Sequence, residues 1–139
     1  MVGSNLIIIQ LNHGLNMEKK LILIVDDDEQ ILNMLEEGLE LQNNYEIEIS
    51  QNSKEFLNLV YQIKYDVLLI DHQMPLKQGS DLAIDLRRKE GPNQKAPIIF
   101  ISGHLKDLKS IVKDLENIYF LQKPINLKEL AKLIDQFTV

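Results

Sequence analysis

Three absences narrow what this chain can be. It contains no cysteine, which excludes disulfides and thiolate-bound metal sites and gives no sign of an oxidising compartment. No apolar run approaches the roughly 18 residues that a membrane-spanning helix requires. Acidic residues outnumber basic ones, and the net charge of −6 argues against direct contact with the phosphate backbone of nucleic acid. We therefore expect a soluble, cytoplasmic protein that contacts neither membrane nor nucleic acid.

The chain has 139 residues, of which 45% are apolar, as expected for one folded domain with a core of its own. Residues 1–16 stand apart from the rest in their composition. One interpretation is that Met17 is the natural start, so that residues 1–16 form a flexible N-terminal extension and residues 17–139 the domain. The alternative is that Leu6–Leu11 adds an edge strand or a dimer contact, because exposed β-prone segments tend to pair.

The stretch DVLLIDHQMP, residues 66–75, is central to the interpretation of the chain. Its four consecutive apolar residues, Val67–Ile70, do not alternate with polar ones, so they predict a strand buried on both faces, as in a parallel sheet. Asp71 follows this strand directly, and Met74-Pro75 closes it, because proline has no N–H for the ladder. A carboxylate is thereby placed at the carboxyl end of a buried strand, where open α/β sheets bind their ligands.

From Leu21 onward, apolar strand patterns alternate with amphipathic helix patterns and short connections. The expected strands are Leu21–Val25, Tyr45–Ile49, Val67–Ile70, Pro97–Ile101 and Ile118–Leu121. The expected helices begin near Glu29, Ser53, Ser80, Leu105 and Leu127. Asn52 and Asn126, each followed by Glu three residues later, indicate helix starts. Five strands alternating with five helices predict a doubly wound, flavodoxin-like α/β fold with a parallel sheet in the order 2-1-3-4-5.

This topology brings polar residues together at one edge of the sheet, since right-handed crossovers send the carboxyl ends of all parallel strands to the same side. The residues expected there are Asp26, Asp27, Asp71, Ser102 and Lys123. Crowded carboxylates resist ionisation unless a cation joins them, and a set of oxygen ligands suits Mg²⁺. A nearby hydroxyl and ammonium group can hold phosphoryl oxygens. The pattern therefore indicates an aspartate that accepts phosphate with the help of a metal.

Five short motifs, in order and each at the end of an expected strand, carry a family resemblance. They are the acidic pair in LILIVDDDE (Asp26, Asp27), DHQMPLKQG with Asp71 and Gly79, the hydroxyl and small residue in FISGH (Ser102, Gly103), Lys123-Pro124 in FLQKP, and the aromatic Phe120 three residues before the lysine. In these motifs the chain from about Lys19 to Phe137 resembles the receiver domain of two-component response regulators. The resemblance also implies a cis Lys123-Pro124 peptide bond.

The resemblance implies that Asp71 accepts a phosphoryl group from a phosphohistidine on a sensor histidine kinase or a histidine phosphotransfer protein. Asp27 and Asp71 would bind Mg²⁺, or alternatively Mn²⁺, with Asp26 assisting directly or through water. Gln73 would lend its backbone carbonyl to the metal. The protein would then be a phosphoacceptor signalling domain that catalyses only its own phosphotransfer and dephosphorylation, rather than an enzyme.

The resemblance also implies a switch. Lys123 would pair with the phosphoryl oxygens, Ser102 would turn to bind one of them, and Phe120 would follow into the space that Ser102 leaves. This would signal to a downstream protein through the face formed by the fourth helix, fifth strand and fifth helix. Since only Thr138 and Val139 follow Phe137, we expect a stand-alone receiver, monomeric or weakly dimeric, that acts by docking on other proteins.

Several residues depart from the family pattern or admit simpler interpretations. Ser102 replaces the commoner threonine, and Asp28 is expected to cap the first helix rather than to bind metal. Gln73 and His104 occupy positions that influence phosphoryl lifetime in the family, which leads to the hypothesis that they set it here. We do not expect His72 or His104 to ligate the metal, because the carboxylates suit a harder ion.

Each switch residue also has a structural interpretation. Ser102 alone could cap a helix, Lys123 could be a surface charge, and Phe120 could be plain core. Two other classes of protein are a metal-dependent hydrolase on a similar sheet and a degenerate receiver that only binds partners. The hydrolase lacks a supporting motif, and a degenerate receiver is expected to lack either Asp71 or Lys123. The sequence therefore favours a phosphorylatable receiver.

Overall fold

The computed structural model describes residues 19–42, 44–75 and 77–137. The expected extension of residues 1–16 and the alternative edge strand at Leu6–Leu11 lie outside this part of the chain. Within it, strands and helices alternate throughout, in the order β1 (Lys20–Val25), α2 (Glu29–Glu40), β2 (Tyr45–Ser50), α3 (Ser53–Val60), β3 (Val67–Asp71), α4 (Gly79–Arg88), β4 (Ile98–Ser102), α5 (Leu105–Ile111), β5 (Ile118–Gln122) and α6 (Leu127–Asp135).

The five strands form one parallel sheet in the order β2-β1-β3-β4-β5, which confirms the predicted flavodoxin-like topology. Strand β3 lies at the centre, and all five of its residues are buried, as the unbroken apolar run predicts. The chain reverses its direction of winding between β1 and β3. The carboxyl ends of these two strands therefore border the switch point of the sheet.

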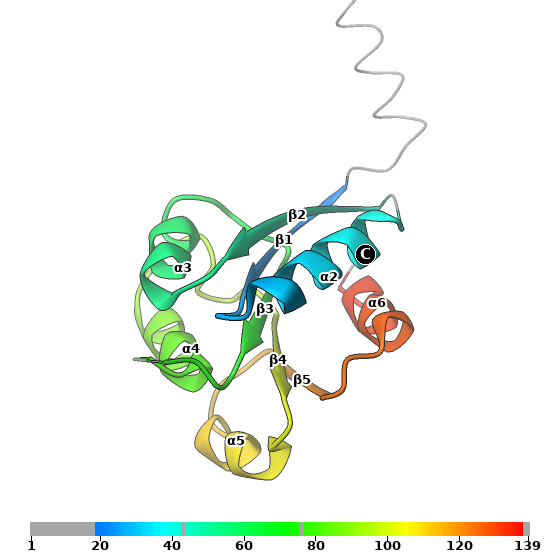
Figure 1. The fold of residues 1–139 in the computed structure, drawn as a ribbon. Coiled ribbons are helices and arrows are strands. Elements are labelled where there is room, and N and C mark those ends of the chain that lie inside the picture. The colour runs from blue at the N-terminus through cyan, green and yellow to red at the C-terminus, as the bar shows by residue number, and fades with distance from the viewer. Residues whose placement is uncertain (1–18, 43, 76, 138–139) are drawn as a thin grey trace, which may run out of the picture.

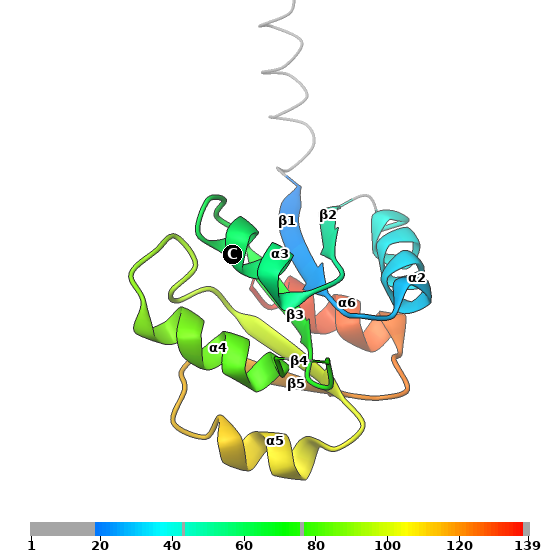
Figure 2. The same cartoon turned by 60° about the vertical axis from the view of Figure 1, so that its left-hand side comes forward.

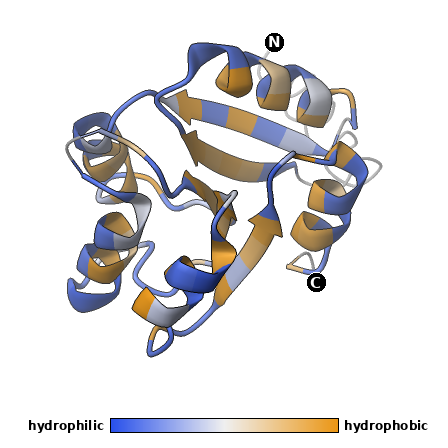
Figure 3. Ribbon diagram, turned by 60° about the horizontal axis from the view of Figure 1, so that its bottom comes forward, coloured by the Kyte–Doolittle hydropathy of each residue, from blue (hydrophilic) through white to orange (hydrophobic). Residues whose placement is uncertain are grey.

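Helices cover both faces of the sheet (Figures 1 and 2). Residues of α3, α4 and α5 form one apolar cluster with β-strand residues such as Phe100, and residues of α2 and α6 form the other with residues such as Ile101. Figure 3 shows the same division, with apolar residues along the strands and polar residues on the outer sides of the helices. None of the helices in the described part of the chain is both long and apolar enough to cross a membrane.

Local sequence signals place most helix starts correctly. The carboxylate of Asp28 accepts hydrogen bonds from the amides of Gln30 and Ile31, so Asp28 caps α2 as expected. Asn52 caps α3 by accepting from the amide of Glu55, and Asn126 caps α6 in the same way. These caps satisfy amides that have no partner within the helix.

Two details of the helices differ from what periodicity predicts. In α2 the helical spacing of Ile31, Met34, Leu35 and Leu39 predicts Met34 on the core stripe, but Met34 is 43% exposed, and Leu32 is fully buried instead. The helical spacing of Leu105, Leu108, Val112 and Leu115 predicts one apolar stripe, but helix α5 ends at Ile111, so Leu115 lies beyond it. Gly38, for which the sequence offers no explanation, lies where α2 meets α6: a Cβ there would come within 2.6 Å of a methyl group of Leu127.

Candidate functional site

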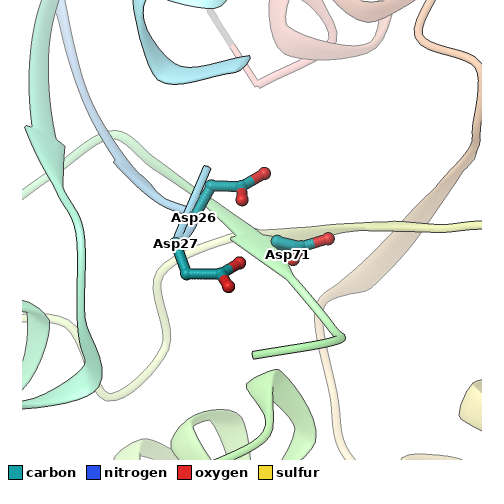
Figure 4. A group of neighbouring side chains, drawn as sticks. All are labelled: Asp26, Asp27 and Asp71. Carbon is teal, nitrogen blue, oxygen red and sulfur yellow. The ribbon is translucent and has the colours of Figure 1, made fainter. Parts of the chain in front are cut away.

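Three carboxylates meet at the switch point of the sheet. Val25 and Ile70 are partners in the register of β1 and β3, so Asp26 and Asp71 follow at the same level of the sheet. Each of Asp26, Asp27 and Asp71 offers an oxygen atom, and these atoms all lie within 4.8 Å of one another. Figure 4 shows the three carboxylates projecting side by side from the ends of the two strands. Asp26 and Asp71 are buried, whereas Asp27 is exposed to solvent.

Ionisation of the two buried carboxylates is electrostatically unfavourable. Burial raises the pKa of Asp26 to about 6, with further upward contributions from Asp71 and Asp27, while the amide of Asp28, which donates to Asp26 Oδ1 at 2.9 Å, lowers it. Burial also raises the pKa of Asp71, and the charge of Asp27 adds to this, against the opposing effect of Lys123. Ionising all of these groups together is unfavourable without more positive charge.

Lys123 supplies one positive charge. It follows β5 directly, and its Nζ lies 2.8 Å from Oδ1 of Asp71. Partial burial by itself lowers the pKa of the Lys123 ammonium, but its hydrogen bond to Asp71 and the charges of all three carboxylates outweigh this, so that the pKa is raised. Lys123 therefore remains charged at neutral pH and is not a free surface lysine. The peptide bond to Pro124 is cis, as the family resemblance implied.

Ser102 is the last residue of β4 and is buried. Its hydroxyl oxygen accepts a hydrogen bond from the amide of His104 at 3.0 Å, so it lies within the turn before α5 rather than capping the first turn of that helix. The amide of Lys123 donates to the Ser102 carbonyl at 2.9 Å. The hydroxyl and the lysine are thereby tied to the same end of the sheet.

Phe120 occupies the middle of β5 and is half-buried. Its ring stacks on Phe100 of β4, with 6.2 Å between ring centroids and 21° between ring planes. The ammonium group of Lys109, from α5, lies 5.3 Å from the centroid of the Phe120 ring. This position links the core to the surface between β5 and α5, and a switching role for Phe120 stays a prediction.

The residues around the acceptor divide into buried and exposed ones. Gly79 begins α4, and a Cβ at this position would lie 2.6 Å from the Asp71 carbonyl oxygen, which explains the requirement for glycine. Gln73 and His104 are exposed. His72 is buried and lies outside the carboxylate group, which is the only set of three candidate metal ligands among the residues that the structure describes.

Two buried polar residues that support the strands of the site could not be recognised from the sequence. The fully buried Ser50 extends β2 by one residue. Its hydroxyl donates to the Ile24 carbonyl, and its backbone carbonyl accepts from the amide of Asp26. Buried Asn93 binds the amide of Tyr65 and the carbonyls of Val60 and Ile63, which fixes the loop that enters β3. No pattern in the sequence distinguishes these two residues from surface serine and asparagine.

The donor set fits a divalent metal ion. Its members are oxygen atoms only, from carboxylates of which two are buried and resist ionisation. A hard cation such as Mg²⁺ prefers oxygen ligands, binds through a few carboxylates and keeps several waters. The exposed Asp27 leaves one side of the group open to solvent, as such a partly hydrated ion requires.

The sheet topology and the acidic site define a class of small α/β signalling domains. The response regulator receiver domain family matches residues 22–135, and the chain belongs to this family. Receiver domains are phosphoacceptor modules of two-component signalling, rather than enzymes that act on an external substrate.

Relatives and solved structures agree with this assignment. The nisin biosynthesis regulatory protein NisR of Lactococcus lactis is 32% identical over 117 residues, which cover 82% of this chain and 48% of NisR. The chain thus spans about half the length of the curated relatives it matches.

Two solved structures are informative in different ways. The chemotaxis protein CheY4 of Vibrio cholerae, at 24% identity and a TM-score of 0.78, covers 86% of this chain and 98% of its own, and shows the fold alone. The response regulator TrrA of Thermotoga maritima, at 27% identity and a TM-score of 0.73, covers 85% of this chain and 98% of its own. TrrA was solved in complex with Mg²⁺ and BeF.

Proposed function

We propose that this chain accepts a phosphoryl group on Asp71 from a phosphohistidine of a sensor histidine kinase or a histidine phosphotransfer protein, in a Mg²⁺-dependent reaction. One observation carries the proposal: the buried Asp71 carboxylate lies beside those of Asp26 and Asp27 and 2.8 Å from the Lys123 ammonium. A receiver that only binds partners has no need for this combination.

Asp26, Asp27, Asp71 and the backbone carbonyl of Gln73 would hold the Mg²⁺ ion, and Mn²⁺ is an alternative with the same ligand preference. The bound ion supplies positive charge that neutralises the oxygens of the transferring phosphoryl group. Asp27 is the one of the three carboxylates that is exposed to solvent.

The nucleophile is an oxygen of the Asp71 carboxylate. A P–O bond forms between this oxygen and the phosphoryl group while the P–N bond to the donor imidazole breaks, and the electron pair of that bond returns to the imidazole nitrogen. Lys123 opposes the rise in the Asp71 pKa that burial causes, and it then pairs with a phosphoryl oxygen. The Ser102 hydroxyl donates a hydrogen bond to a second phosphoryl oxygen. Attack of water on phosphorus returns the carboxylate and releases phosphate.

The signal leaves through the surface formed by α5, β5 and α6. Phosphorylation replaces a carboxylate paired with Lys123 by a larger, more strongly charged group, which favours a new position for Ser102 and then for Phe120. The altered surface docks on a downstream protein in the cytoplasm, without direct contact with nucleic acid. Residues 17–139 form the receiver unit and act as a monomer or weak dimer.

The proposal is tested by the intact mass of the chain after incubation with a small-molecule phosphodonor and Mg²⁺. We expect a gain of one acid-stable, base-labile phosphoryl group that is absent without Mg²⁺ and absent in Asp71→Asn. That substitution preserves the shape of the side chain but removes the nucleophile. A folded native chain that binds Mg²⁺ and gains no mass would overturn the proposal in favour of a binding-only receiver.

A further inference from the structure

His72 is a buried titratable residue to which the proposed phosphotransfer assigns no role. It follows the acceptor Asp71 directly, and only 7% of its surface is exposed. The rings of His72 and Phe100 pack edge to face, with 6.4 Å between their centroids and 88° between their planes. This is a favourable geometry for two aromatic rings. His72, the residue next to Asp71 in the chain, thereby contacts a buried ring of β4.

The contact continues to β5. Phe100 and Phe120 are direct partners in the register of β4 and β5, and their rings are stacked. His72, Phe100 and Phe120 therefore form an aromatic chain that runs from the end of β3 to the half-exposed ring on β5. Phe100, in the middle, is fully buried. A fully buried ring in a close-packed core cannot move without displacing its neighbours.

The backbone of His72 is held firmly on both sides. Its amide donates to the carbonyl of Ile101 in β4 at 3.2 Å, and its carbonyl accepts from the amide of Gly79 in α4 at 3.0 Å. Gly79 packs so closely that a Cβ there would lie 3.0 Å from the Cα of His72. A displacement of the strand end at Asp71 is therefore passed to the His72 ring, because the surrounding backbone leaves little slack.

Packing alone does not account for a histidine at this position. Its Nδ1 atom is buried and has no hydrogen-bond partner among the residues that the structure describes. Burying a polar atom in this way is unfavourable, whereas a leucine of similar size would carry no such penalty. What the histidine has and an aliphatic side chain lacks is the edge-to-face ring contact with Phe100.

We propose that His72 is a positioning residue of the phosphorylation switch: through Phe100, it holds Phe120 in its half-exposed position while Asp71 carries no phosphoryl group, and it passes on the displacement when Asp71 is modified. This inference rests on the proposed function, and it adds a route to Phe120 that does not pass through Ser102.

The test is ¹⁹F NMR of the full chain with its phenylalanines replaced by fluorophenylalanine. The chain has four phenylalanines, so four resonances are expected, and Phe120→Leu identifies the one of interest. Mg²⁺ with beryllium fluoride serves as the phosphoryl mimic. We expect the mimic to displace the Phe120 resonance in the native chain and in His72→Phe. That variant keeps a ring and adds a fifth resonance, which Phe120→Leu in the same background tells apart from that of Phe120. In His72→Leu we expect only a small part of this displacement, with phosphorylation of Asp71 still reaching the native stoichiometry.

A matched control lies on the opposite face of the sheet. Ile101 is buried next to Phe100 but belongs to the cluster of α2 and α6, so Ile101→Val perturbs the core without touching the aromatic chain. It should show the native displacement. If His72→Leu fails to fold, Phe100→Leu interrupts the chain one ring further along and should give the same loss.

Each of the remaining outcomes is decisive. A native displacement of Phe120 in His72→Leu or in Phe100→Leu would overturn the inference and leave the proposed function intact. Loss of the displacement in Ile101→Val as well would overturn it too, because any core change would then suffice. No phosphorylation and no response to the mimic in the native chain would overturn the proposed function, and this inference with it.

Discussion

Nζ of Lys123 lies 2.8 Å from Oδ1 of Asp71, and this ion pair joins the end of β5 to the end of β3 across the intervening strand β4. The side chain of Asp71 is 4% exposed, whereas that of Lys123 is 31% exposed. The lysine therefore approaches the buried carboxylate from the solvent side, where a phosphoryl group on Asp71 would also emerge. Lys123 opposes the rise in the Asp71 pKa that burial causes, and in the proposed phosphotransfer it would place a cation where new negative charge develops.

Replacing Lys123 by methionine separates metal binding from phosphotransfer. We expect phosphorylation of Asp71 to slow by about 10²-fold, because a cation that stabilises the transferring phosphoryl group is lost. Mg²⁺ affinity should stay the same or rise, since a positive charge close to the carboxylates disappears. Rates of mass gain and Mg²⁺ titrations measure the two effects. Lys128→Met, at an exposed lysine of α6, is the control, and an unchanged rate in Lys123→Met would contradict the assigned role.

Replacing Asp26 by asparagine should stabilise the metal-free protein at neutral pH. The pKa of Asp26 is about 6 in the folded state against an ordinary value of 3.8, so the folded state holds the proton more tightly than the unfolded chain. Stability of the native protein therefore falls as the pH rises from about 4 to about 6. Above this window, we expect Asp26→Asn to raise the free energy of unfolding by about 1–2 kcal/mol.

Urea unfolding with and without Mg²⁺ at both ends of this pH range checks the prediction. Asp26→Asn should show a weaker decline of stability with pH than the native chain, the remainder coming from Asp71, whose pKa is raised as well. The added stability from Mg²⁺ should be largely lost, because one oxygen ligand has lost its charge. If Asp26→Asn is less stable than the native chain at neutral pH without metal, ionisation of Asp26 does not destabilise the folded state.

Two glycines near the site should differ in how strongly an added methyl group affects stability. At Gly79 a Cβ would meet the Asp71 carbonyl oxygen at 2.6 Å and Cγ2 of Ile70 at 2.7 Å, so Gly79→Ala should destabilise the fold by about 1–3 kcal/mol. At Gly103 no heavy atom of the described residues lies within 4 Å of the added Cβ, so Gly103→Ala should change stability by less than about 0.5 kcal/mol. Urea unfolding distinguishes the two, and equal effects would contradict the packing described at Gly79.

Gln73 and His104 are predicted to set the lifetime of the phosphoryl group. Both are exposed beside the site, where their side chains can screen phosphorus from water. We expect Gln73→Ala and His104→Ala each to shorten the lifetime severalfold, as measured by loss of the added mass after removal of the phosphodonor. Gln42→Ala, at an exposed residue after α2, serves as the control. Unchanged lifetimes in both variants would refute the hypothesis.

The sequence alone determined the architecture and which carboxylates meet at the site. Buried strands such as β3 are encoded in runs of apolar residues, helix starts in local caps such as Asp28, and the carboxylates in the residues that follow the strands. These signals are local, and the right-handed parallel topology converts them into one shared edge. For this reason the meeting of Asp26, Asp27 and Asp71 could be predicted without coordinates.

Only the tertiary structure decided features that depend on contacts between distant segments. The buried side of α2 contains Leu32 rather than Met34, because the orientation of the helix is set by what it packs against. Gly38 lies against the side chain of Leu127 from α6, some ninety positions along the chain, and that side chain would have to shift to admit a Cβ. The aromatic contacts of His72 likewise join separate strands. The sequence of one segment does not indicate which distant segment packs against it, so these contacts could be identified only in the folded chain.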